Sequence, residues 1–563
     1  MSSNSDMKFY VPFWMDHVYD DFDEWAGTWT TGFQHYKFLW ELNQVSPMDG
    51  VLISRSKIED SPRRKKEIKE AGGVKNFFDI PDELDVFGDC GAYSYRKESE
   101  PPYDPEETLE FYEEMQYDQA CSVDHLINGE QTEDKERRME ITLSNARKMR
   151  QAYEEGDYSF ELYGVVQGWD PDSYHRVAKE LIEMGYDKLA FGGLVGTDTR
   201  DIISILQRCY PLWMDKDVDI HEFGLARWEL FPFMERYGIN SVDNAYHRKA
   251  WLDRKKNYEL TPENEYTAVR IPIADQYAEE REPKEQAVFD ELKRYINDES
   301  DPEDVIETLR DWEKTYAEIE GKDGRVELFE KLKDEYLRTL REKPWEKCNC
   351  HICDEYGLHV CIFRRNERNM RRGFHNLYRF YHYFNGYLEG EVEPPQKIND
   401  YSQPKEIEDL DIEEFENESV LVITSCSKTK KSDSPGDEMP AEELYQGRLV
   451  QNTRGLCKAT GWDHRIISAK YGLVEPEELI SPYEETLESV EDSESLRPKV
   501  LPELAEILDD YDRILVIAGK YYRRVIEPLY DNRVHILNSA GYPVLCSKIK
   551  EATPDRESKL EEY

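Results

Sequence analysis

The sequence predicts an α/β protein in which a (β/α)8 barrel precedes a smaller C-terminal α/β domain. Three observations lead to this fold. Short apolar runs alternate with charged helical segments over residues 1–256, a cysteine cluster follows near residue 350, and new buried-strand runs begin near Ser419. Alternating strands and helices favour a parallel sheet covered by helices, and about 250 residues is the usual length of such a barrel.

Composition indicates a folded chain with an acidic surface. The 563 residues suffice for two to four domains, and 120 acidic against 73 basic residues give a net charge of -47. Such a charge is typical of disordered chains, but 12% aromatic residues and recurrent apolar runs supply a core. Because the acids are spread along the chain, we interpret them as adaptation to a high-salt cytosol, as in halophilic archaea or their viruses.

The ten cysteines show no regular pairing, which indicates a reducing compartment. The N-terminus lacks a basic segment followed by an apolar one, and no run approaches the roughly 18 apolar residues that span a bilayer. We therefore expect a soluble, cytoplasmic protein without membrane association.

Apolar runs and helical periodicity place the first elements. Strands are expected at 50–54, 163–167 and 188–191, and helices at 132–155 and 172–184. A (β/α)8 barrel carries its active site at the carboxyl ends of its strands, so polar residues there are the first candidates.

The remainder of the chain divides by composition. We expect barrel residues at 1–256 and again at 343–390, with a zinc subdomain at 343–388. An acidic helical insertion is expected at 257–342 and a Glu/Pro/Asp-rich linker at 391–418. A C-terminal α/β domain is expected at 419–563, with strands at 420–424, 464–468 and 513–518.

Three cysteines and a histidine have the spacing of a metal site. Cys348, Cys350, Cys353 and His375 form the pattern C-x-C-x2-C-x21-H. Three thiolates and one imidazole suit a closed tetrahedral zinc site, with one structural zinc per chain. The alternative, unrelated core cysteines, must account for three of ten cysteines falling within six residues.

Three aspartates follow strand-like runs at polar turns: Asp89, Asp124 and Asp243. Among 120 acids most are surface residues, so only the contexts of these three single them out. Two further turns look like ligand-binding loops, one ending in Gln167 and one containing Gly192, Gly193 and Leu194.

Taken in order, these motifs resemble the tRNA-guanine transglycosylase superfamily. The resemblance is carried by Asp89–Tyr93, Asp124, Gly164–Gly168, Phe191–Leu194, His221–Gly224, Gly238–Asp243, and the cysteine cluster with His375 in His-Asn-Leu-Tyr. It implies a zinc-bearing barrel that exchanges guanine for a 7-deazaguanine base. Cys90 and Ala92 depart from the pattern, since they stand where the superfamily has a hydroxyl residue and a glycine.

The resemblance also implies a role for each motif. Asp243 is expected to attack the sugar C1′ and form a covalent intermediate, and Asp89 to act as general acid and base. Asp124 and Gln167 are expected to bind the purine edge, and the Gly192–Leu194 loop to hold its carbonyl through the Gly193 and Leu194 amides. Tyr93 is expected to stack on the ring.

Two basic stretches, 247–256 and 363–372, predict contacts with nucleic-acid phosphates. The candidate residues are Arg248, Lys249, Arg254, Arg364, Arg365, Arg371 and Arg372. The segments 122–126 and 243–251 are most similar to DpdA-type enzymes, which implies insertion of 7-cyano-7-deazaguanine into DNA. The same exchange on tRNA, as in archaeosine formation, and a non-catalytic nucleic-acid-binding barrel remain alternatives, and a homodimer is left open.

The C-terminal domain resembles YaaA-like proteins and a domain of archaeosine synthases. Its motifs lie at 425–430, 444–447, 468–473 and 482–483. Cys426, Lys428 and Lys470 could form a nucleophile or an anion site. We expect nucleic-acid or nucleotide binding here rather than catalysis.

Overall fold

The computed structural model describes most of the chain. The described residues are 7–20, 22–25, 28–29, 36–42, 46–128, 133–248, 250, 258–273, 281–322, 324–392, 401–434, 436–538 and 541–554. Every helix within these ranges is too short or too polar to span a bilayer.

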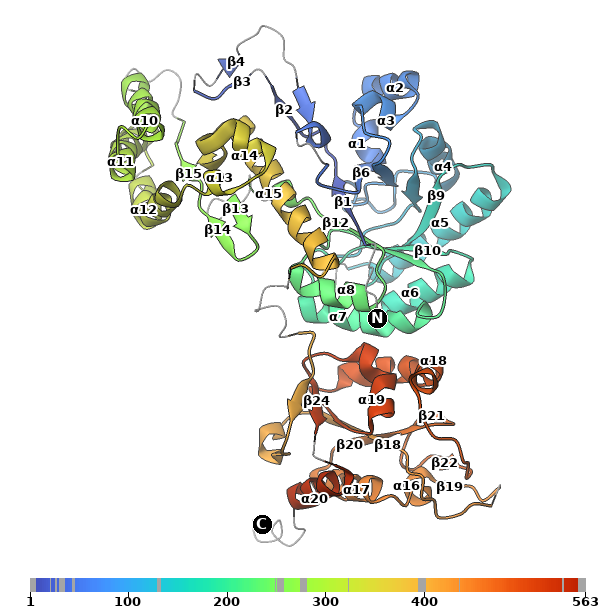
Figure 1. Ribbon diagram of the computed structural model, residues 1–563. Helices are drawn as coiled ribbons and strands as arrows, with labels where there is room; N and C mark the ends of the chain where they lie inside the picture. Colours follow the sequence, from blue (N-terminus) through green and yellow to red (C-terminus); the bar gives the residue numbers. More distant parts are fainter. Residues whose placement is uncertain are drawn as a thin grey trace.

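Eight parallel strands close into a barrel in the order β1-β12-β11-β10-β9-β8-β7-β6 (Figure 1). The strands are β1 (Lys8–Pro12), β6 (Gly50–Ser54), β7 (Asp85–Asp89), β8 (Gln119–Cys121), β9 (Glu161–Val166), β10 (Lys188–Phe191), β11 (Asp219–Glu222) and β12 (Ser241–Asp243). The predicted (β/α)8 barrel is therefore confirmed. Its interior is filled by side chains that include Tyr10, Phe87 and Tyr163, as in other barrels of this kind.

Helices cover the outside of the barrel. They are α1 (Arg55–Glu59), α2 (Pro62–Ala71), α3 (Val74–Phe78), α4 (Pro105–Glu114), α5 (Lys135–Glu155), α6 (Pro171–Glu183), α7 (Thr199–Cys209) and α8 (Phe231–Arg236). Asp-Pro pairs start α4 and α6, because the Asp104 and Asp170 carboxylates accept hydrogen bonds from first-turn amides while proline tolerates the first helical position.

The helix that covers β1 comes from much later in the chain. This helix, α15 (Arg365–Leu388), packs Phe380 and Phe384 against Phe9 at ring-centroid distances of 5.0 and 6.0 Å. The same helix carries His375. The cysteine-bearing segment is thereby attached directly to the barrel wall.

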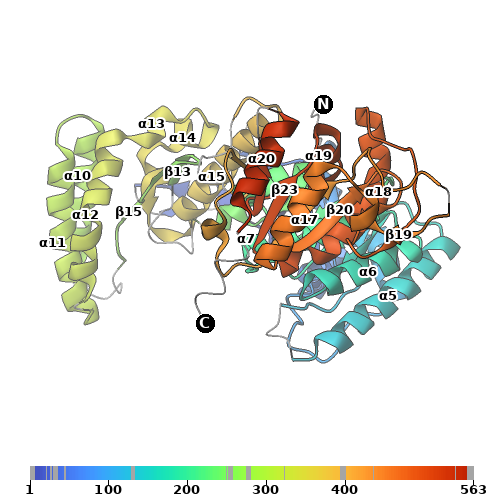
Figure 2. The same cartoon turned by 90° about the horizontal axis from the view of Figure 1, so that it is seen from below.

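The described part of the expected helical insertion, 257–342, begins with short strands and not with helices. β13 (Tyr258–Thr261) pairs with β14 (Asn264–Tyr266), and β15 (Val269–Arg270) pairs with β16 (Ile362–Phe363) beside α15. The expected helices follow as α10 (Arg281–Ile296), α11 (Pro302–Glu320) and α12 (Gly324–Glu342), which stand apart from the barrel (Figures 1 and 2). Two short helices lead through the cysteines, α13 (Pro344–Lys347) and α14 (His351–Tyr356).

Short antiparallel pairs also follow β1. β2 (His17–Tyr19) pairs with β5 (Tyr36–Phe38), and β3 (Phe22–Asp23) pairs with β4 (Thr28–Trp29). The first of these pairs lies beside α15, which β2 contacts.

A six-stranded sheet forms the C-terminal domain, in the order β17-β24-β23-β18-β20-β21. Its strands are β17 (Lys405–Ile407), β18 (Val420–Ser425), β20 (Asp463–Ser468), β21 (Gly472–Val474), β23 (Arg513–Ile517) and β24 (Val534–Leu537). Because β17 pairs with β24, part of the expected linker belongs to this sheet. A separate pair joins β19 (Met439–Pro440) to β22 (Leu479–Ile480).

Helices lie on both faces of the C-terminal sheet (Figure 1). α18 (Val490–Ile507) and α19 (Lys520–Ile526) share one apolar core with the sheet, and α17 (Arg448–Thr460) and α20 (Tyr542–Ala552) share another. The short α16 (Ala441–Leu444) precedes α17. The domain docks on α7 through buried polar contacts, such as Gln207 to Asp531 at 2.9 Å.

Candidate active site

The carboxyl ends of the barrel strands gather the predicted catalytic and base-binding residues. Asp89 ends β7 and Asp243 ends β12, while Gln167 follows β9 directly. Asp124 lies three residues after β8, and Gly192 follows β10 directly. Parallel strands in a closed barrel place these ends on one face, where the active sites of such barrels lie.

Hydrogen bonds fix the carboxylate of Asp243. Its Oδ1 accepts from the backbone N–H of Gly224 at 3.0 Å and lies 3.2 Å from Nε2 of His221. Ser241 Oγ lies 2.8 Å from Nδ1 of the same ring, so Ser241 holds the ring with Nε2 toward Asp243. Gly224 has φ +72°, and a Cβ there would lie 2.4 Å from Val195, so the turn that supplies this donor requires glycine.

Asp89 sits in the same group of charges. Its pKa is raised to about 7, mainly by burial and also by the nearby carboxylates of Asp124 and Asp243, while hydrogen bonds from Ser54 and the Gly91 amide oppose the rise. Its Oδ1 is buried with no hydrogen-bond partner among the described residues. This oxygen is therefore available to a bound molecule, and the carboxyl can exchange a proton near neutral pH.

A buried network surrounds Asp124. Cys90 Sγ lies 2.9 Å from Oδ1, and Gln167 Nε2 donates to Oδ2 at 2.7 Å. Burial raises the pKa of Asp124. The hydroxyl of Tyr95 lies 2.8 Å from the Cys90 sulfur and donates to the Asp124 carbonyl at 2.9 Å. The thiol of Cys90 is therefore part of the network that holds the Asp124 carboxylate.

The glycine loop after β10 lies against this network. Gly193 has φ +80°, and a Cβ there would lie 2.4 Å from the Ile127 carbonyl and 2.9 Å from Gln167 Oε1. The Gly192 N–H already donates to the Val166 carbonyl at 2.9 Å. Among the described residues, the N–H groups of Gly193 and Leu194 donate to no backbone carbonyl, so these two amides are open to a ligand.

Tyr93 lies at the rim of the barrel mouth. Its side chain is 69% exposed, and the Arg96 guanidinium lies 3.9 Å from its ring centroid. The ring is therefore accessible on the loop that follows Asp89.

A cavity of about 1110 Å³ adjoins the loops that follow β9 and β10. It is lined by Gly168 and Gly193 from the barrel and by Asp509, Asp512 and Arg513 from the C-terminal domain. Carboxylates outnumber guanidinium groups along its wall, which disfavours a phosphate backbone there.

Three of the predicted phosphate contacts are wrong because their side chains are buried in the fold. Arg364 pairs with Glu285, and Arg371 pairs with Glu24. Arg372 is fully buried and donates to the Ile362 carbonyl at 2.9 Å. These guanidinium groups hold α15 to neighbouring segments and do not face solvent.

Two of the other predicted phosphate contacts, Arg365 and Arg248, reach the surface. Arg365 is exposed at the start of α15. Arg248 is partly exposed, donates to Asp16 at 3.1 Å and stacks on Trp14 with 3.8 Å to the ring centroid. Lys249 and Arg254 lie outside the described residues.

Two residues at β11 had no predicted role, although both lie in a motif that the sequence singled out. His221 orients Asp243, as described above. Glu222 is fully buried, neither carboxylate oxygen has a partner among the described residues, and burial raises its pKa to about 8. Since His221 contacts the interior residues Tyr10 and Phe87, strand alternation turns Glu222 to the outer side of the barrel.

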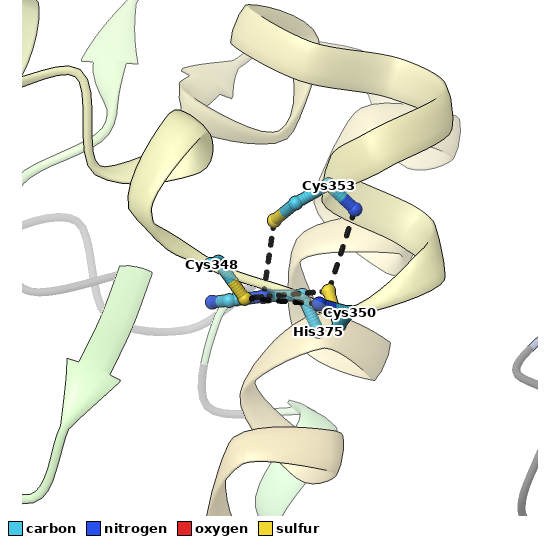
Figure 3. Close-up of side chains that lie close together, drawn as sticks. All are labelled: Cys348, Cys350, Cys353 and His375. Carbon is cyan, nitrogen blue, oxygen red and sulfur yellow. Dashed lines mark hydrogen bonds between the residues drawn. The ribbon is translucent and has the colours of Figure 1, made fainter.

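The predicted metal ligands converge (Figure 3). The sulfur atoms of Cys348, Cys350 and Cys353 and a nitrogen of His375 lie within 4.8 Å of one another, and all four residues are buried. His375 Nε2 lies 3.0 Å from the Glu259 carbonyl, which leaves Nδ1 facing the thiols. A ligand histidine commonly donates its other N–H in this way, so the cluster could bind a metal ion.

Comparison with known proteins agrees with this geometry. The queuine tRNA-ribosyltransferase family matches residues 48–285, and a family of unknown function (DUF6884) matches residues 420–539. A DNA-guanine transglycosylase of Salmonella montevideo is 33% identical over 362 residues, which cover 59% of this chain and 85% of that protein.

Two tRNA enzymes match shorter segments. A queuine tRNA-ribosyltransferase of Chromohalobacter salexigens is 30% identical over 142 residues, 25% of this chain and 37% of that protein. A tRNA-guanine(15) transglycosylase of Methanocaldococcus jannaschii is 23% identical over 210 residues, 36% of this chain and 32% of that protein. The chain thus belongs to the tRNA-guanine transglycosylase superfamily, and it is a pentosyltransferase of the guanine transglycosylase type that acts on nucleic acid.

Proposed function

We propose that this protein exchanges a guanine base in DNA for 7-cyano-7-deazaguanine through a covalent glycosyl intermediate on Asp243. The observation that carries this proposal is the arrangement of Asp243 and Asp89 in one group of charges at the barrel mouth. One carboxylate is held by fixed donors, and the other titrates near neutrality.

In the first step the Asp243 carboxylate attacks C1′ as the bond from C1′ to guanine N9 breaks. The electron pair of that bond leaves with guanine, which takes a proton from the neutral Asp89 carboxyl. The Gly224 amide and His221 hold Oδ1, so the attacking group has a fixed orientation. A covalent glycosyl-enzyme results.

The second step reverses these roles. The incoming 7-deazaguanine gives its N9 proton to the Asp89 carboxylate, attacks C1′ and displaces the Asp243 carboxylate. Two inversions give net retention at C1′, as in retaining glycosidases. A pKa of about 7 lets one group serve as acid and then as base.

Recognition of the base is assigned to the network beside these acids. The carboxylate of Asp124 and the amide of Gln167 face hydrogen-bonding atoms of the purine edge, and the Gly193 and Leu194 amides bind its carbonyl oxygen. The buried position of Asp124 and Gln167 supports this role, because buried hydrogen bonds discriminate strongly between related bases.

DNA is favoured over tRNA by the extent of similarity. The similarity to a DNA-guanine transglycosylase spans 85% of that protein, whereas the similarities to the two tRNA enzymes span 37% and 32%. Exchange on tRNA is the second candidate, supported by the same catalytic residues.

For the nucleic-acid contact we propose the rim of the barrel after β1 and β7. Trp14 is 41% exposed beside Arg248, and Tyr93 is exposed beside Arg96. Stacking on aromatic rings depends less on salt than phosphate contacts do, which suits the acidic chain. Tyr93 is proposed to stack on the exchanged base or its neighbour, and Arg365 to contact phosphate.

We further propose that the Cys348, Cys350, Cys353 and His375 cluster holds one structural zinc ion. Four protein ligands fill a tetrahedral site, so this ion would stabilise the fold and leave no position for substrate. It would join the cysteine segment to α15 and to the strand that contains Glu259.

The function is tested by offering labelled 7-cyano-7-deazaguanine with duplex DNA, single-stranded DNA or tRNA, in molar salt. Incorporation into DNA but not tRNA is expected. Incorporation into tRNA alone would select the second candidate, and label in no polymer would favour a non-catalytic barrel. Guanine release should accompany incorporation with one base freed for each base inserted.

A further inference from the structure

The C-terminal domain contains a polar cluster that the base exchange does not use. The cluster lies at the carboxyl edge of the parallel strands and consists of Cys426, Lys428, Lys430, Tyr445, Ser468, Lys470, Tyr483, Lys520 and Tyr522. The family that matches this region has no assigned function.

The strand order marks this edge as a ligand position. The chain passes from β18 to β20 on one side, whereas β23 pairs with the opposite side of β18 and leads outward to β24. The direction of winding therefore reverses between β18 and β23. Doubly wound sheets bind ligands outside the carboxyl ends of strands at such a reversal.

Residues that follow those strands meet in the structure. Cys426, directly after β18, lies 3.3 Å from the hydroxyl of Tyr522 on α19, which follows β23. The hydroxyls of Tyr445, Tyr483 and Ser468 lie 2.8 to 3.1 Å from one another. Burial raises the pKa values of Tyr445, Tyr483 and Tyr522, so all three phenols are neutral at neutral pH.

Positive charge collects at the same edge. Lys430 Nζ lies 4.3 Å from the ring centroid of Tyr483, and Lys470 Nζ lies 5.9 Å from the same centroid. Within the described chain Lys428, Lys430, Lys470 and Lys520 form no ion pair, while Lys431 and Lys458 of the same domain pair with Glu443 and Glu442.

We propose that this edge of the C-terminal domain binds the phosphate group of a nucleotide, free or within a polynucleotide. Ammonium groups and neutral hydroxyls are complementary to phosphate oxygens, and the partly exposed Tyr471 ring offers a face to the attached base or sugar. The start of α17 lies beside this site, because Gly447 donates its N–H to Ser427, the neighbour of Cys426. The positive end of the helix dipole therefore adds to the attraction for an anion.

Cys426 offers a local probe of this site. It is the one cysteine of ten that is not buried, so a neutral maleimide should label it selectively while the metal-binding cysteines remain buried. The rate of labelling is measured in the Asp243→Asn protein, which makes the result independent of base exchange. The additions are deoxyguanosine, deoxyguanosine monophosphate and a short single-stranded oligonucleotide, at constant ionic strength.

We expect the phosphate-bearing compounds to slow labelling at least fivefold at saturation and deoxyguanosine to have no effect. Slowing by the oligonucleotide alone would identify a polynucleotide as the source of the phosphate, and slowing by the monophosphate would identify a free nucleotide. The Lys430→Gln/Lys470→Gln protein should lose the effect, whereas Lys458→Gln should retain it. Unchanged labelling with both phosphate compounds, or equal slowing by deoxyguanosine, would overturn the proposal.

Discussion

His221 Nε2 lies 3.2 Å from Oδ1 of Asp243, and both residues face the interior of the barrel mouth. The histidine joins the ends of two adjacent strands, β11 and β12, and is itself held by Ser241. This relationship makes His221 a positioning residue for the proposed nucleophile.

Replacing His221 with Ala should therefore lower kcat and leave KM for the incoming base nearly unchanged. A misoriented nucleophile typically costs about a hundredfold in rate. His221→Gln retains an amide donor and should recover part of the loss. A structural role alone would instead lower the melting temperature in both variants without separating kcat from KM.

Asp243→Asn should abolish incorporation, by at least about a thousandfold, because a neutral amide cannot form the glycosyl ester. The melting temperature should change little, since the amide retains an oxygen that can accept from Gly224. Asp217→Asn is the matched control, because Asp217 is exposed and precedes β11 at the other end of the barrel. A trapped protein–DNA adduct should form with wild type and be absent from Asp243→Asn. Full activity in that variant would remove Asp243 from the nucleophile role.

The raised pKa of Asp89 predicts how the rate of guanine release depends on pH. With a pKa of about 7, the neutral carboxyl is lost as pH rises through 7, so kcat for release should fall about tenfold per pH unit above that value. Single-turnover release of guanine, measured from pH 5.5 to 9, tests this fall in rate above pH 7. Asp89→Asn should be nearly inactive and show no such fall.

The same raised pKa means that Asp89 lowers the free energy of unfolding at alkaline pH. A carboxyl whose folded pKa lies above its unfolded pKa binds more protons when folded, so stability falls between about pH 4 and pH 7 and stays lower above it. Asp89→Asn should raise the free energy of unfolding at pH 8 by about 1–3 kcal/mol. Glu222→Gln is the matched comparison: it should also stabilise the fold above pH 8, but it should retain activity because Glu222 lies outside the site. Equal loss of activity in both variants would contradict the assignment of Asp89.

The metal cluster predicts one zinc per chain by elemental analysis. Cys350→Ser should lose the ion and lower the melting temperature, because the thiolates would then lack the charge that compensates them. Cys361→Ala is the control, since Cys361 is buried nearby and is not one of the clustered ligands. Zinc retained in Cys350→Ser at full occupancy would rule out this ligand set.

Much of the site could be predicted because strand ends are local features of the sequence. The apolar runs that became β6 and β10 end where the structure ends them, and parallel strands in a barrel must bring their carboxyl ends together. Asp89, Asp124 and Asp243 follow from that rule. The role of His221 could have been inferred in the same way, since it lies two residues before the Phe-Gly turn that supplies the Gly224 amide.

The arginines of α15 show what the sequence does not reveal. Arg364 and Arg371 looked like a basic surface, but their partners Glu285 and Glu24 lie 79 and 347 residues away along the chain. Local charge density cannot distinguish a buried ion pair from an exposed phosphate contact, because the difference lies in tertiary packing. Strands of two or three residues, such as β15 and β17, are likewise too short to give a periodic signal.

Measurements of DNA affinity should distinguish the exposed residues proposed to contact DNA from the buried arginines of α15. Arg365→Gln should lower the slope of log affinity against log salt by about 1, since it removes one phosphate contact. Trp14→Ala should weaken binding by about 1–3 kcal/mol with no change in that slope, because stacking releases no counterions. Arg372→Gln should instead lower the melting temperature, since it leaves the Ile362 carbonyl without its donor. Fluorescence anisotropy over a salt series, with melting curves for each variant, measures all three effects. An unchanged DNA affinity of Trp14→Ala would exclude the rim after β1 as a DNA contact, whatever the outcome for Arg365.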